Sequence, residues 1–201
     1  MKGYLKKLPN EVQDLILLAG DIASRNNMRA YLVGGCVRDL LLEVKNLDLD
    51  IVIEGNGIKF SEELARVFNT KLIRHKRFGT ATVDFPIYRL KIDIATARKE
   101  FYPEPAHLPV VENGSLKDDL KRRDFTINAI AININKDGFD KLLDLFGGAQ
   151  DLKNRKIRVL HDLSFIDDPT RILRGIRFEQ RYNFRFEQKT KKLLKGAVAL
   201  R

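Results

Sequence analysis

One segment, residues 46–53, constrains the fold of this chain more than any other, because it alternates acidic and apolar side chains. Its sequence is Asn-Leu-Asp-Leu-Asp-Ile-Val-Ile. Side chains of an extended strand point alternately to its two faces, so a strand over residues 47–53 would bury Leu47 and the apolar residues that follow it. Asp48 and Asp50 would then stand roughly 6–7 Å apart on the opposite face. The pattern predicts a strand with one buried face and one acidic face.

The acidic pair has two interpretations. Carboxylates this close repel each other unless a cation lies between them. Their hard oxygen atoms suit Mg²⁺, which proteins usually bind through one or two carboxylates and substrate phosphates. The alternative is a half-exposed strand whose aspartates are simply solvated, which is the commoner meaning of an isolated Asp-x-Asp. Asp48 and Asp50 therefore become candidate metal ligands only with support from a second feature.

A glycine pair supplies that support. Gly34 and Gly35 lie between a predicted short strand at residues 31–33 and a predicted helix that ends near Leu42. Such a turn lets the backbone approach a phosphate closely, and the helix N-terminus adds a favourable partial charge. Arg38, in the first helical turn, could reach a triphosphate oxygen. An ordinary turn can also contain two glycines, but beside the acidic strand the pair predicts a phosphate site next to a Mg²⁺ site.

A third acid, Asp93, occupies a similar position on a later strand. In the strand predicted over residues 88–95, the apolar residues at alternate positions share one face, so Asp93 points the other way with basic neighbours. It could join the acidic pair as a general base for an incoming hydroxyl, or polarise the site. A simple ion pair with a neighbouring Arg or Lys is the alternative.

Composition narrows the choice of partner and compartment. The chain has 201 residues, and 37 Lys and Arg against 27 Asp and Glu give a net charge of +10. This excess indicates a polyanionic partner, either a nucleic acid or an anionic membrane surface. A single cysteine, Cys36, excludes a disulfide framework and fits a reducing compartment. Since no apolar run reaches membrane-spanning length and the N-terminus lacks a signal-peptide core, we predict a cytoplasmic protein with no membrane segment.

The pattern divides the chain into a mixed α/β head over residues 1–145 and a mostly helical neck over residues 146–201. Helical spacing in the head covers residues 11–28 and 58–68, and strand alternation covers residues 71–74, 80–85 and 88–95. Residues 99–115 contain three prolines and a glycine and predict a long irregular loop, of the kind that is often functional.

The helix predicted from residue 167 onward is rich in arginine. At about 100° per residue, one face collects Ile172, Leu173 and Ile176, and the opposite face collects Arg171, Arg174, Arg177 and Arg181. A charged face is usually just solvated, but arginines crowded this closely repel, and an anion would relieve that repulsion. Asp and Arg side chains also offer the acceptors and paired donors that can read the edge of a base.

Four motifs occur in order: Gly34-Gly35-Cys36-Val37-Arg38-Asp39, then Asp48-Leu49-Asp50, then Arg122-Arg123-Asp124-Phe125-Thr126-Ile127-Asn128-Ala129, and finally residues 168–178. Together they resemble the class II tRNA nucleotidyltransferase and bacterial poly(A) polymerase family, within the polymerase-β-like nucleotidyltransferases. The resemblance extends from residue 31 to about residue 186. It implies a head with a mixed sheet and flanking helices, followed by a helical neck.

The resemblance also implies roles for individual residues. Asp48 and Asp50 would hold Mg²⁺, and Asp168 and Arg171 would form hydrogen bonds with the Watson–Crick edge of ATP or CTP. The remaining nucleotide-binding residues would contact the triphosphate or ribose, or steady the template: Gly34, Gly35, Arg38, Arg122, Arg123, Arg174 and Arg177. The chain departs from the family at Asp167, where a Glu is usual. Family members continue into body and tail domains that grip the tRNA, so the chain is expected to be either a truncated or a natural minimal form of the family.

The implied reaction is attack by an RNA 3′-hydroxyl on the α-phosphate of a nucleotide, with release of pyrophosphate. We expect CCA addition to the 3′ end of tRNA from CTP and ATP, with addition of A alone or poly(A) synthesis as alternatives. A non-catalytic RNA-binding module is the alternative from another class, and nucleotidyl transfer to a small molecule is a further one. The intact acidic pair argues against the module, and the basic excess argues against a small-molecule acceptor.

Overall fold

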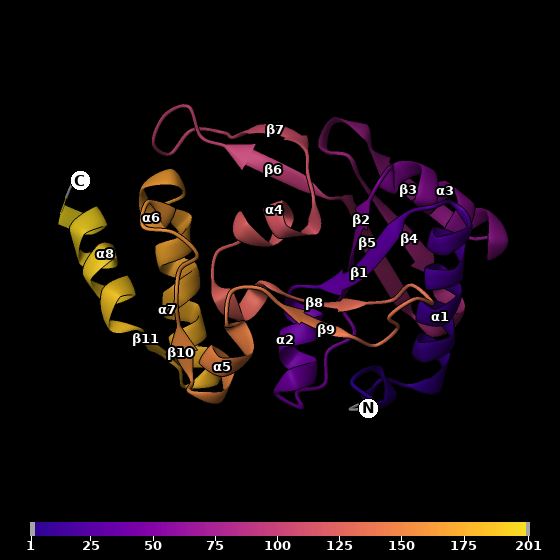
Figure 1. Ribbon diagram of the computed structural model, residues 1–201, viewed down its shortest axis with the longest axis horizontal. Coiled ribbons are helices and arrows are strands. Elements are labelled where there is room, and N and C mark those ends of the chain that lie inside the picture. Colours follow the sequence, from indigo (N-terminus) through magenta and orange to yellow (C-terminus); the bar gives the residue numbers. More distant parts are fainter. Residues whose placement is uncertain (1–2, 200–201) are drawn as a thin grey trace.

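A seven-stranded mixed sheet forms the centre of the computed structural model, which describes residues 3–199 (Figure 1). Its strands are β1 (Arg29–Val33), β2 (Leu49–Glu54), β3 (Lys71–His75), β4 (Thr80–Phe85), β5 (Leu90–Thr96), β8 (Ile130–Asn133) and β9 (Leu142–Asp144). They lie in the order β3-β4-β5-β2-β1-β8-β9. Within this sheet only β2 and β5 pair in parallel, and every other neighbouring pair is antiparallel. This arrangement confirms the α/β fold with a mixed sheet and flanking helices.

Helices precede, separate and follow the strands of the central sheet along the sequence. They are α1 (Asn10–Arg25), α2 (Gly35–Leu41), α3 (Gly57–Val67), α4 (Leu116–Lys121), α5 (Gly148–Lys153), α6 (Ser164–Asp167), α7 (Thr170–Tyr182) and α8 (Gln188–Ala199). Short 3₁₀ turns cover Leu5–Lys7, Lys76–Phe78, Pro86–Tyr88 and Thr126–Asn128, and two small sheets pair β6 (Arg98–Phe101) with β7 (Val110–Asn113) and β10 (Lys156–Ile157) with β11 (Arg185–Phe186). No helix within residues 3–199 is long and apolar enough to cross a membrane.

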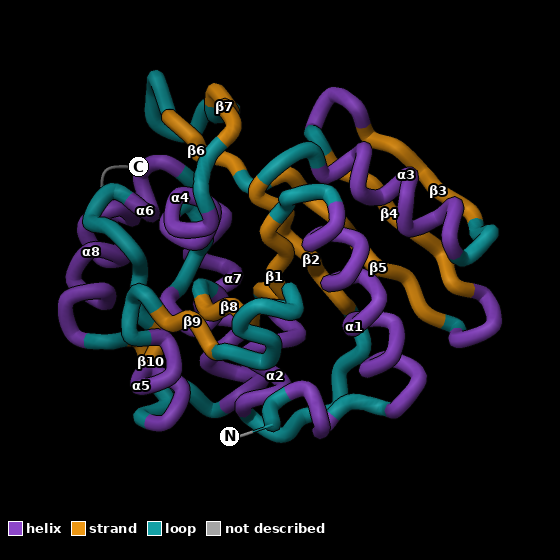
Figure 2. Tube along the Cα trace, turned by 45° about the vertical axis from the view of Figure 1, so that its right-hand side comes forward, coloured by secondary structure: helices purple, strands orange, loops and turns teal. Residues whose placement is uncertain are grey.

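The two faces of the central sheet are covered unequally. Figure 2 shows α1 and α3 along one face, where alternate strand residues such as Leu32, Ile53 and Ile92 are buried against them. On the other face, α4 buries a second, smaller apolar cluster over β1, β2 and β8, which includes Leu120 and Val33. The strands β3, β4 and β5 extend beyond this cluster. Their residues on that face are exposed or half-buried, so half of the face stays open.

The acidic strand begins later than its sequence pattern predicts. β2 starts at Leu49, because its pairing with β5 begins with Leu49 opposite Ile92. Asp48 precedes the strand, and its backbone N–H donates to the side chain of Asn46 instead. Leu47 is 37% exposed, so its predicted place in the core is wrong. The alternation holds from Leu49 onward, and only Asp50 of the acidic pair belongs to the strand itself.

The irregular loop predicted over residues 99–115 is also wrong in part. Arg98–Phe101 and Val110–Asn113 pair as an antiparallel hairpin, with Arg98 opposite Asn113. The three prolines, at positions 103, 105 and 109, all lie in the connection between the two strands, where no ladder hydrogen bond is needed. Residues 102–109 alone are irregular.

The predicted faces of α7 are wrong in part, although Ile172 packs against the core and Arg174, Arg177 and Arg181 are exposed. Leu173 is 71% exposed and Ile176 is 43% exposed, whereas Arg171 is only 4% exposed. The buried residues of this helix are Arg171, Gly175 and Phe178. Helical periodicity groups Arg171 with the other arginines and Leu173 with the apolar residues, so the burial of Arg171 and the exposure of Leu173 are not expected from it. The error arises because polar partners from other segments satisfy the Arg171 guanidinium and turn that side of the helix toward the head.

Head and neck share one apolar core. The main cluster contains α1 and sheet residues and continues through Phe125 to Phe165, Phe178 and Phe184 of the C-terminal part. In Figure 1 the helices α5 to α8 gather at the end of the molecule away from α1 and α3. The last strand of the central sheet ends at Asp144 and α5 starts at Gly148. The division at residue 145 into two domains stays a prediction.

Candidate active site

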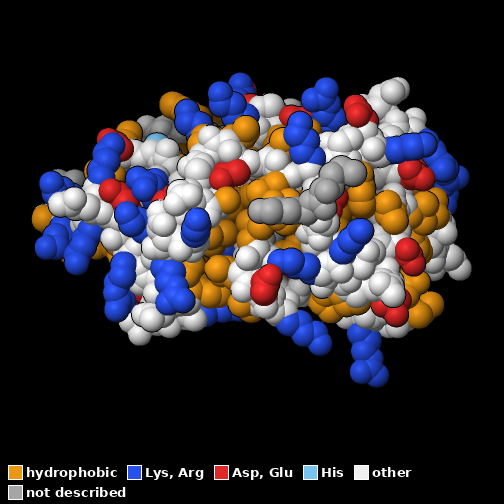
Figure 3. Space-filling view, turned by 60° about the horizontal axis from the view of Figure 1, so that its bottom comes forward, with side chains coloured by type: hydrophobic (Ala, Val, Ile, Leu, Met, Phe, Trp, Pro, Cys, Tyr) orange, Lys and Arg blue, Asp and Glu red, His pale blue; other side chains and the backbone are white. Residues whose placement is uncertain are grey.

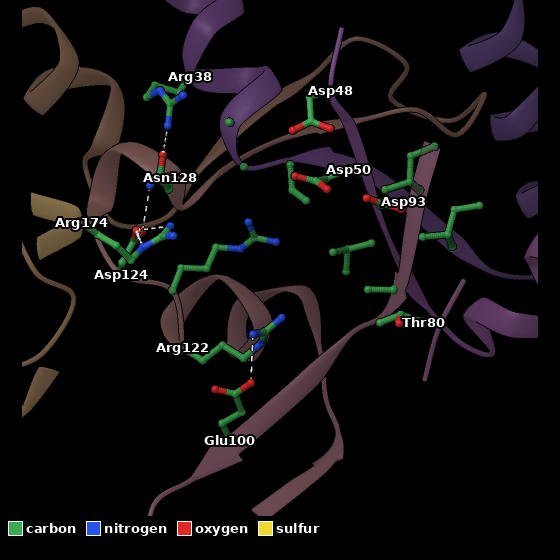
Figure 4. Close-up of a pocket in the computed structure, with 18 of the residues that line it drawn as sticks. Arg38, Asp48, Asp50, Thr80, Asp93, Glu100, Arg122, Asp124, Asn128 and Arg174 are labelled. Carbon is green, nitrogen blue, oxygen red and sulfur yellow. Dashed lines mark hydrogen bonds and ion pairs between the residues drawn. The ribbon is translucent and has the colours of Figure 1, made fainter. Parts of the chain in front are cut away.

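A cavity of about 880 Å³ lies where the open half of the sheet meets α4 and α7. Acidic residues on β2, just before it and on β5 line one side of the cavity, and arginines from α2, from the end of α4 and from α7 line the other, as Figure 4 shows. We call these the acidic wall (Asp48, Asp50 and Asp93) and the arginine wall (Arg38, Arg122, Arg123, Arg171 and Arg174). All of these residues were predicted site residues, and the fold brings them together from segments that are far apart in the sequence.

Gly34 separates the two walls. Its φ of +74° lies in the left-handed region that favours glycine. A Cβ atom here would approach Nη1 of Arg123 to 2.9 Å and Oδ2 of Asp50 to 3.1 Å. Any side chain at position 34 would therefore fill the space between a cation of one wall and a carboxylate of the other. Gly35 begins α2 immediately afterwards and also lines the cavity.

The acidic wall is built by strand pairing. Asp50 lies directly opposite Asp93 in the parallel β2–β5 pair, and Asp93 lies opposite Thr82 in the β4–β5 pair. The Thr82 hydroxyl donates to Oδ1 of Asp93 over 2.6 Å. Asp48 and Asp93 are exposed and Asp50 is half-buried. The sheet register thus places Asp93 beside the pair, as the strand pattern predicts.

The charges of the acidic wall are incompletely compensated. Burial raises the pKa of Asp50 from its ordinary value near 3.8 to about 6. The guanidinium of Arg123 lowers that pKa, whereas the negative charges of Asp48 and Asp93 raise it further. Because burial and the neighbouring carboxylates together outweigh the attraction of Arg123, an additional cation at this wall would stabilise the ionised form of Asp50.

A divalent cation fits this donor set. Within residues 3–199 no three His, Cys, Asp or Glu side chains converge to form a complete metal site. Mg²⁺ commonly takes only one or two carboxylates from a protein and completes its shell with water and substrate phosphates. Asp48 and Asp50 offer such a partial set of hard oxygen ligands. The Gly34 turn leaves space for a phosphate beside them.

Buried acids hold the α4 side of the arginine wall. Asp119, which is fully buried, accepts hydrogen bonds from Arg122 at 2.7 and 3.0 Å through one oxygen and from Arg123 at 3.0 and 3.3 Å through the other. Glu100 accepts a further bond from Nη1 of Arg122 over 3.0 Å and is itself bonded by Arg98. These contacts fix both guanidiniums. Nη1 of Arg123 remains directed at the Gly34 turn.

Arg38 is held more tightly than its sequence position suggests. Its guanidinium bonds both oxygens of Asp39, at 2.8 and 3.0 Å, and also Asn128 and the Tyr182 hydroxyl. The rings of Phe178 and Tyr182 lie 5.1 and 4.9 Å from it. Four of its five N–H groups therefore have protein partners. One N–H remains for a phosphate, and the main effect of Arg38 is to join α2 to α7.

The start of α7 completes the arginine wall. Arg171 donates to the Ser164 hydroxyl at 2.7 Å and to the backbone carbonyl of Arg122 at 2.9 Å, and its Nε lies 3.6 Å from Oδ2 of Asp168. Arg174 bonds Asp124, and Figure 4 shows this pair linked through Asn128 to Arg38. Arg177 is exposed and, among the described residues, is not part of the cavity lining.

Several residues of this site receive no role from the sequence, although Asp39, Asp124 and Asn128 lie within the quoted motifs. They are the acids that hold the arginines, namely Asp39, Glu100, Asp119 and Asp124, together with Thr82, Asn128 and Tyr182. One signal was available for Asp119, which lies three and four positions before the arginine pair on a helix, the spacing of a helical ion pair. The contacts of Tyr182 and Glu100 link distant segments, so no local pattern reveals them.

Comparison with known proteins identifies the family of this head. Residues 30–158 match the family model described as poly(A) polymerase head domain. An A-adding tRNA nucleotidyltransferase of Geobacter sulfurreducens is 46% identical over 97% of the chain, and that of Halalkalibacterium halodurans is 47% identical over 92%. A CCA-adding enzyme of Lactobacillus helveticus is 38% identical over 83%. The chain spans 22%, 43% and 40% of the length of these three relatives.

Solved structures agree with this comparison. An apo form of a CCA-adding enzyme superposes with a TM-score of 0.94 at 51% identity, over 98% of the present chain and 46% of the other. A Thermotoga maritima CCA-adding enzyme in complex with tRNA gives a TM-score of 0.88 at 49% identity, over 99% of this chain and 45% of the other. The described fold therefore matches a part of these enzymes that makes up slightly less than half of their length.

Proposed function

Because the chain belongs to the poly(A) polymerase head-domain family of tRNA nucleotidyltransferases, we propose that it transfers nucleotides from CTP and ATP to the 3′-hydroxyl of tRNA, with release of pyrophosphate. The observation that carries the proposal is the pairing of an under-compensated acidic wall with an arginine wall across Gly34. Phosphoryl transfer requires in-line positioning and charge neutralisation rather than a covalent intermediate, and this arrangement can provide both. The predicted cytoplasmic location agrees with a tRNA substrate.

In this proposal, the arginine wall binds the triphosphate. Nη1 of Arg123 is directed at the Gly34 turn, and Arg122 and Arg174 line the same cavity, so these three side chains surround the proposed site of the phosphates. Arg38 mainly positions the others, because most of its N–H groups are already bonded to protein. Asp119 and Asp124 prevent the arginines from rearranging when the anion leaves.

The acidic wall acts on the incoming hydroxyl. Asp48 and Asp50 would hold Mg²⁺, which when bound lowers the charge repulsion between nucleotide and acceptor and promotes loss of the hydroxyl proton. Asp93 lies next to Asp50 and can accept that proton as the oxygen attacks the α-phosphate. The bond from the α-phosphorus to the bridging oxygen of the pyrophosphate then breaks on the opposite side.

The base is proposed to be read by Asp168 and Arg171 at the start of α7. Oδ1 of Asp168 accepts bonds from Thr170, which leaves Oδ2 directed toward Arg171 and the cavity. A carboxylate and a guanidinium together present the acceptor and donor groups that complement the edge of adenine or cytosine. Asp167 stands where the family usually has a Glu. Within the described residues its side chain pairs with His161 and not with Asp168 or Arg171.

Addition of A alone is the second candidate, and a specific observation favours it. The A-adding relatives are 46–53% identical to the chain, whereas the CCA-adding relatives are 35–38% identical. One observation favours CCA addition instead: a solved structure of a CCA-adding enzyme is 51% identical to the chain. Because the chain spans less than half of these proteins, acceptor choice can also depend on segments that these relatives possess beyond it.

Incubation with tRNA that lacks its 3′ end tests the proposal. Labelled CTP and ATP are supplied separately and together, each with Mg²⁺. Incorporation of both nucleotides, in the order C, C, A, supports CCA addition, whereas incorporation of ATP alone onto a tRNA that already ends in CC supports A addition. No incorporation by the unaltered chain contradicts the proposal.

A double variant separates an enzyme from a non-catalytic RNA-binding module. Asp48→Ala together with Asp50→Ala removes the acidic pair without touching the arginines. An enzyme should lose incorporation by at least about a thousandfold and keep its RNA affinity. A module would show the same RNA binding and no incorporation before or after the change.

A further inference from the structure

The open half of the sheet face lies directly beside the acidic wall. We define the open sheet face by the outward residues of β3, β4 and β5, which include Lys71, Ile73, Thr82, Lys91 and Asp93. The register runs without a break from Ile73 to Thr82, to Asp93 and to Asp50. In the described part of the chain, no helix covers this face. The helix next to these strands, α3, packs against their opposite side.

In-line transfer requires the attacking hydroxyl and the leaving pyrophosphate to lie on opposite sides of the α-phosphate. Along the sheet row, the Gly34 turn and Arg123 lie beyond Asp50, whereas Thr82 and the open sheet face lie beyond Asp93. If the arginine wall holds the triphosphate, the attacking hydroxyl must approach from the side of Asp93. The open sheet face is the surface on that side.

Its charge suits a polyanion. Lys71 and Lys91 are exposed, and neither forms an ion pair within residues 3–199. Asp84 lies opposite both of them in the register, so the lysines flank a single acid. At the other end of the face, Arg77 lies 5.9 Å from the ring of Phe78, which is 62% exposed. Cationic side chains beside an exposed aromatic ring are the usual elements of a single-strand binding surface.

Its size suits a short single strand. Three strands spaced by about 4.8 Å make the face roughly 10 Å wide, and five residues of β3 span about 13 Å. At about 3.4 Å per stacked nucleotide, this length holds roughly three to four nucleotides. The face is thus large enough for an unpaired 3′ end.

We propose that the open sheet face binds the unpaired 3′ end of the RNA acceptor, with the terminal hydroxyl against Asp93 and the preceding phosphates near Lys71 and Lys91. This inference rests on the proposed function and adds the path of the acceptor strand. It gives β3 and β4, which contribute none of the candidate ligands of the nucleotide, a role in acceptor binding.

The test compares two double variants with equal loss of charge. Lys71→Ala with Lys91→Ala changes the open sheet face, and Lys136→Ala with Lys141→Ala removes two exposed lysines near the opposite edge of the same sheet. Incorporation of labelled ATP into an RNA hairpin with an unpaired 3′-CC end is measured at varied RNA and at varied ATP. We expect the first variant to raise KM for RNA by about tenfold and to leave KM for ATP within about twofold, and the control to change neither.

The salt dependence gives an independent readout, because each lost phosphate contact with a single strand lowers the slope of log affinity against log salt by about 0.7. The first variant should therefore reduce the slope by about 1.4 and the control should not. Two results would overturn the assignment of this face while the proposed function stands. One is an equal KM for RNA in both variants, and the other is a rise in KM for ATP in the first variant that equals its rise in KM for RNA. Absence of incorporation by the unaltered chain would overturn both.

Discussion

The two walls of the cavity are charged in opposite senses and built in opposite ways. Each arginine contacts at least one acid, and three of these acids, Asp39, Asp119 and Asp124, are buried. The acidic wall has no comparable support: the only side chain that bonds Asp93 is Thr82, and Asp50 keeps a raised pKa despite Arg123, within the described residues. One wall is therefore rigid and neutralised before a ligand binds, whereas the other retains uncompensated negative charge.

The positive charge of the molecule is of two kinds, one spread over the surface and one oriented in the cavity. Figure 3 shows Lys and Arg side chains spread over a whole face of the molecule and more numerous there than Asp and Glu. The net charge of +10 is thus a general attraction for polyanions rather than a site. The arginine wall differs from that background because buried acids orient its donors.

The largest expected effect comes from removing an anchor of the arginine wall. Asp119→Ala leaves Arg122 and Arg123 without their shared partner, and loss of one member of a buried ionic cluster costs about 3–5 kcal/mol. Urea unfolding measures the change. Asp118→Ala, at the neighbouring half-buried position of the capping box of α4, should cost only about 1 kcal/mol. Equal losses in the two variants would show that Asp119 does not anchor this wall.

The acidic wall should respond in the opposite direction. The folded pKa of Asp50, about 6, exceeds the ordinary value of 3.8, so the folded state binds the proton more tightly and ionisation costs stability. That cost is absent well below pH 4, grows between pH 4 and 6 and is complete above pH 6. With metal removed, Asp50→Asn should therefore be more stable than the unaltered chain by about 2–3 kcal/mol at pH 8.

Urea titrations at several pH values in EDTA check this expectation. The advantage of Asp50→Asn should shrink by roughly 1 kcal/mol between pH 7 and 5. Asp137→Asn, at an exposed loop position, should show no such dependence. A destabilised Asp50→Asn protein at pH 8 would mean that the acidic wall is compensated like the arginine wall.

A smaller effect is expected where α2 and α7 meet. The Tyr182 hydroxyl accepts from Arg38 and donates to Asp39, at 2.8 and 2.9 Å, while its ring stacks on the same guanidinium. Tyr182→Phe removes only the hydroxyl and should cost about 1–2 kcal/mol of unfolding free energy. Tyr182→Leu also removes the cation–π contact and should cost more. If Tyr182→Phe leaves the free energy of unfolding unchanged, the hydrogen bonds of the Tyr182 hydroxyl do not stabilise the junction of α2 and α7.

The smallest expected effect concerns the single support of the acidic wall. Thr82→Val keeps the shape of the side chain but removes the hydrogen bond to Asp93, so kcat should fall about three- to tenfold with KM for ATP unchanged. Thr82→Ser restores a hydroxyl and should recover most of the rate. A matched loss in Thr82→Ser would indicate that strand packing, rather than orientation of Asp93, is responsible.

The acidic wall is the part of the site that a local pattern can predict. Alternation around Asp50 and Asp93 indicates strands with outward carboxylates, and the Gly34 turn follows from two adjacent glycines. The pattern fails at Asp48, because its backbone N–H finds a closer partner in Asn46 than in the sheet. The start of a strand depends on pairing with a distant segment, which a single stretch of sequence does not contain.

The arginine wall shows the opposite limit. The motifs locate its arginines, but periodicity groups Arg171 with arginines that are exposed and Leu173 with the apolar residues, whereas Arg171 is buried and Leu173 is exposed. The orientation of α7 depends on Ser164 and on a backbone carbonyl of α4, which satisfy a buried guanidinium. Hydrogen bonds from distant segments to a buried guanidinium outweigh the hydrophobic pattern of one helix. The acids and hydroxyls that hold the arginines can therefore be assigned only from the folded chain.

We propose above all that Asp48 and Asp50 bind a divalent cation together with the triphosphate at the Gly34 turn. Calorimetric titration of a non-hydrolysable ATP analogue, with and without Mg²⁺, tests it on the unaltered chain and on the Asp48→Asn/Asp50→Asn double variant. We expect Mg²⁺ to tighten binding by at least about tenfold in the unaltered chain and to have little effect in the variant. The same gain from Mg²⁺ in both proteins would show that Asp48 and Asp50 do not hold the cation.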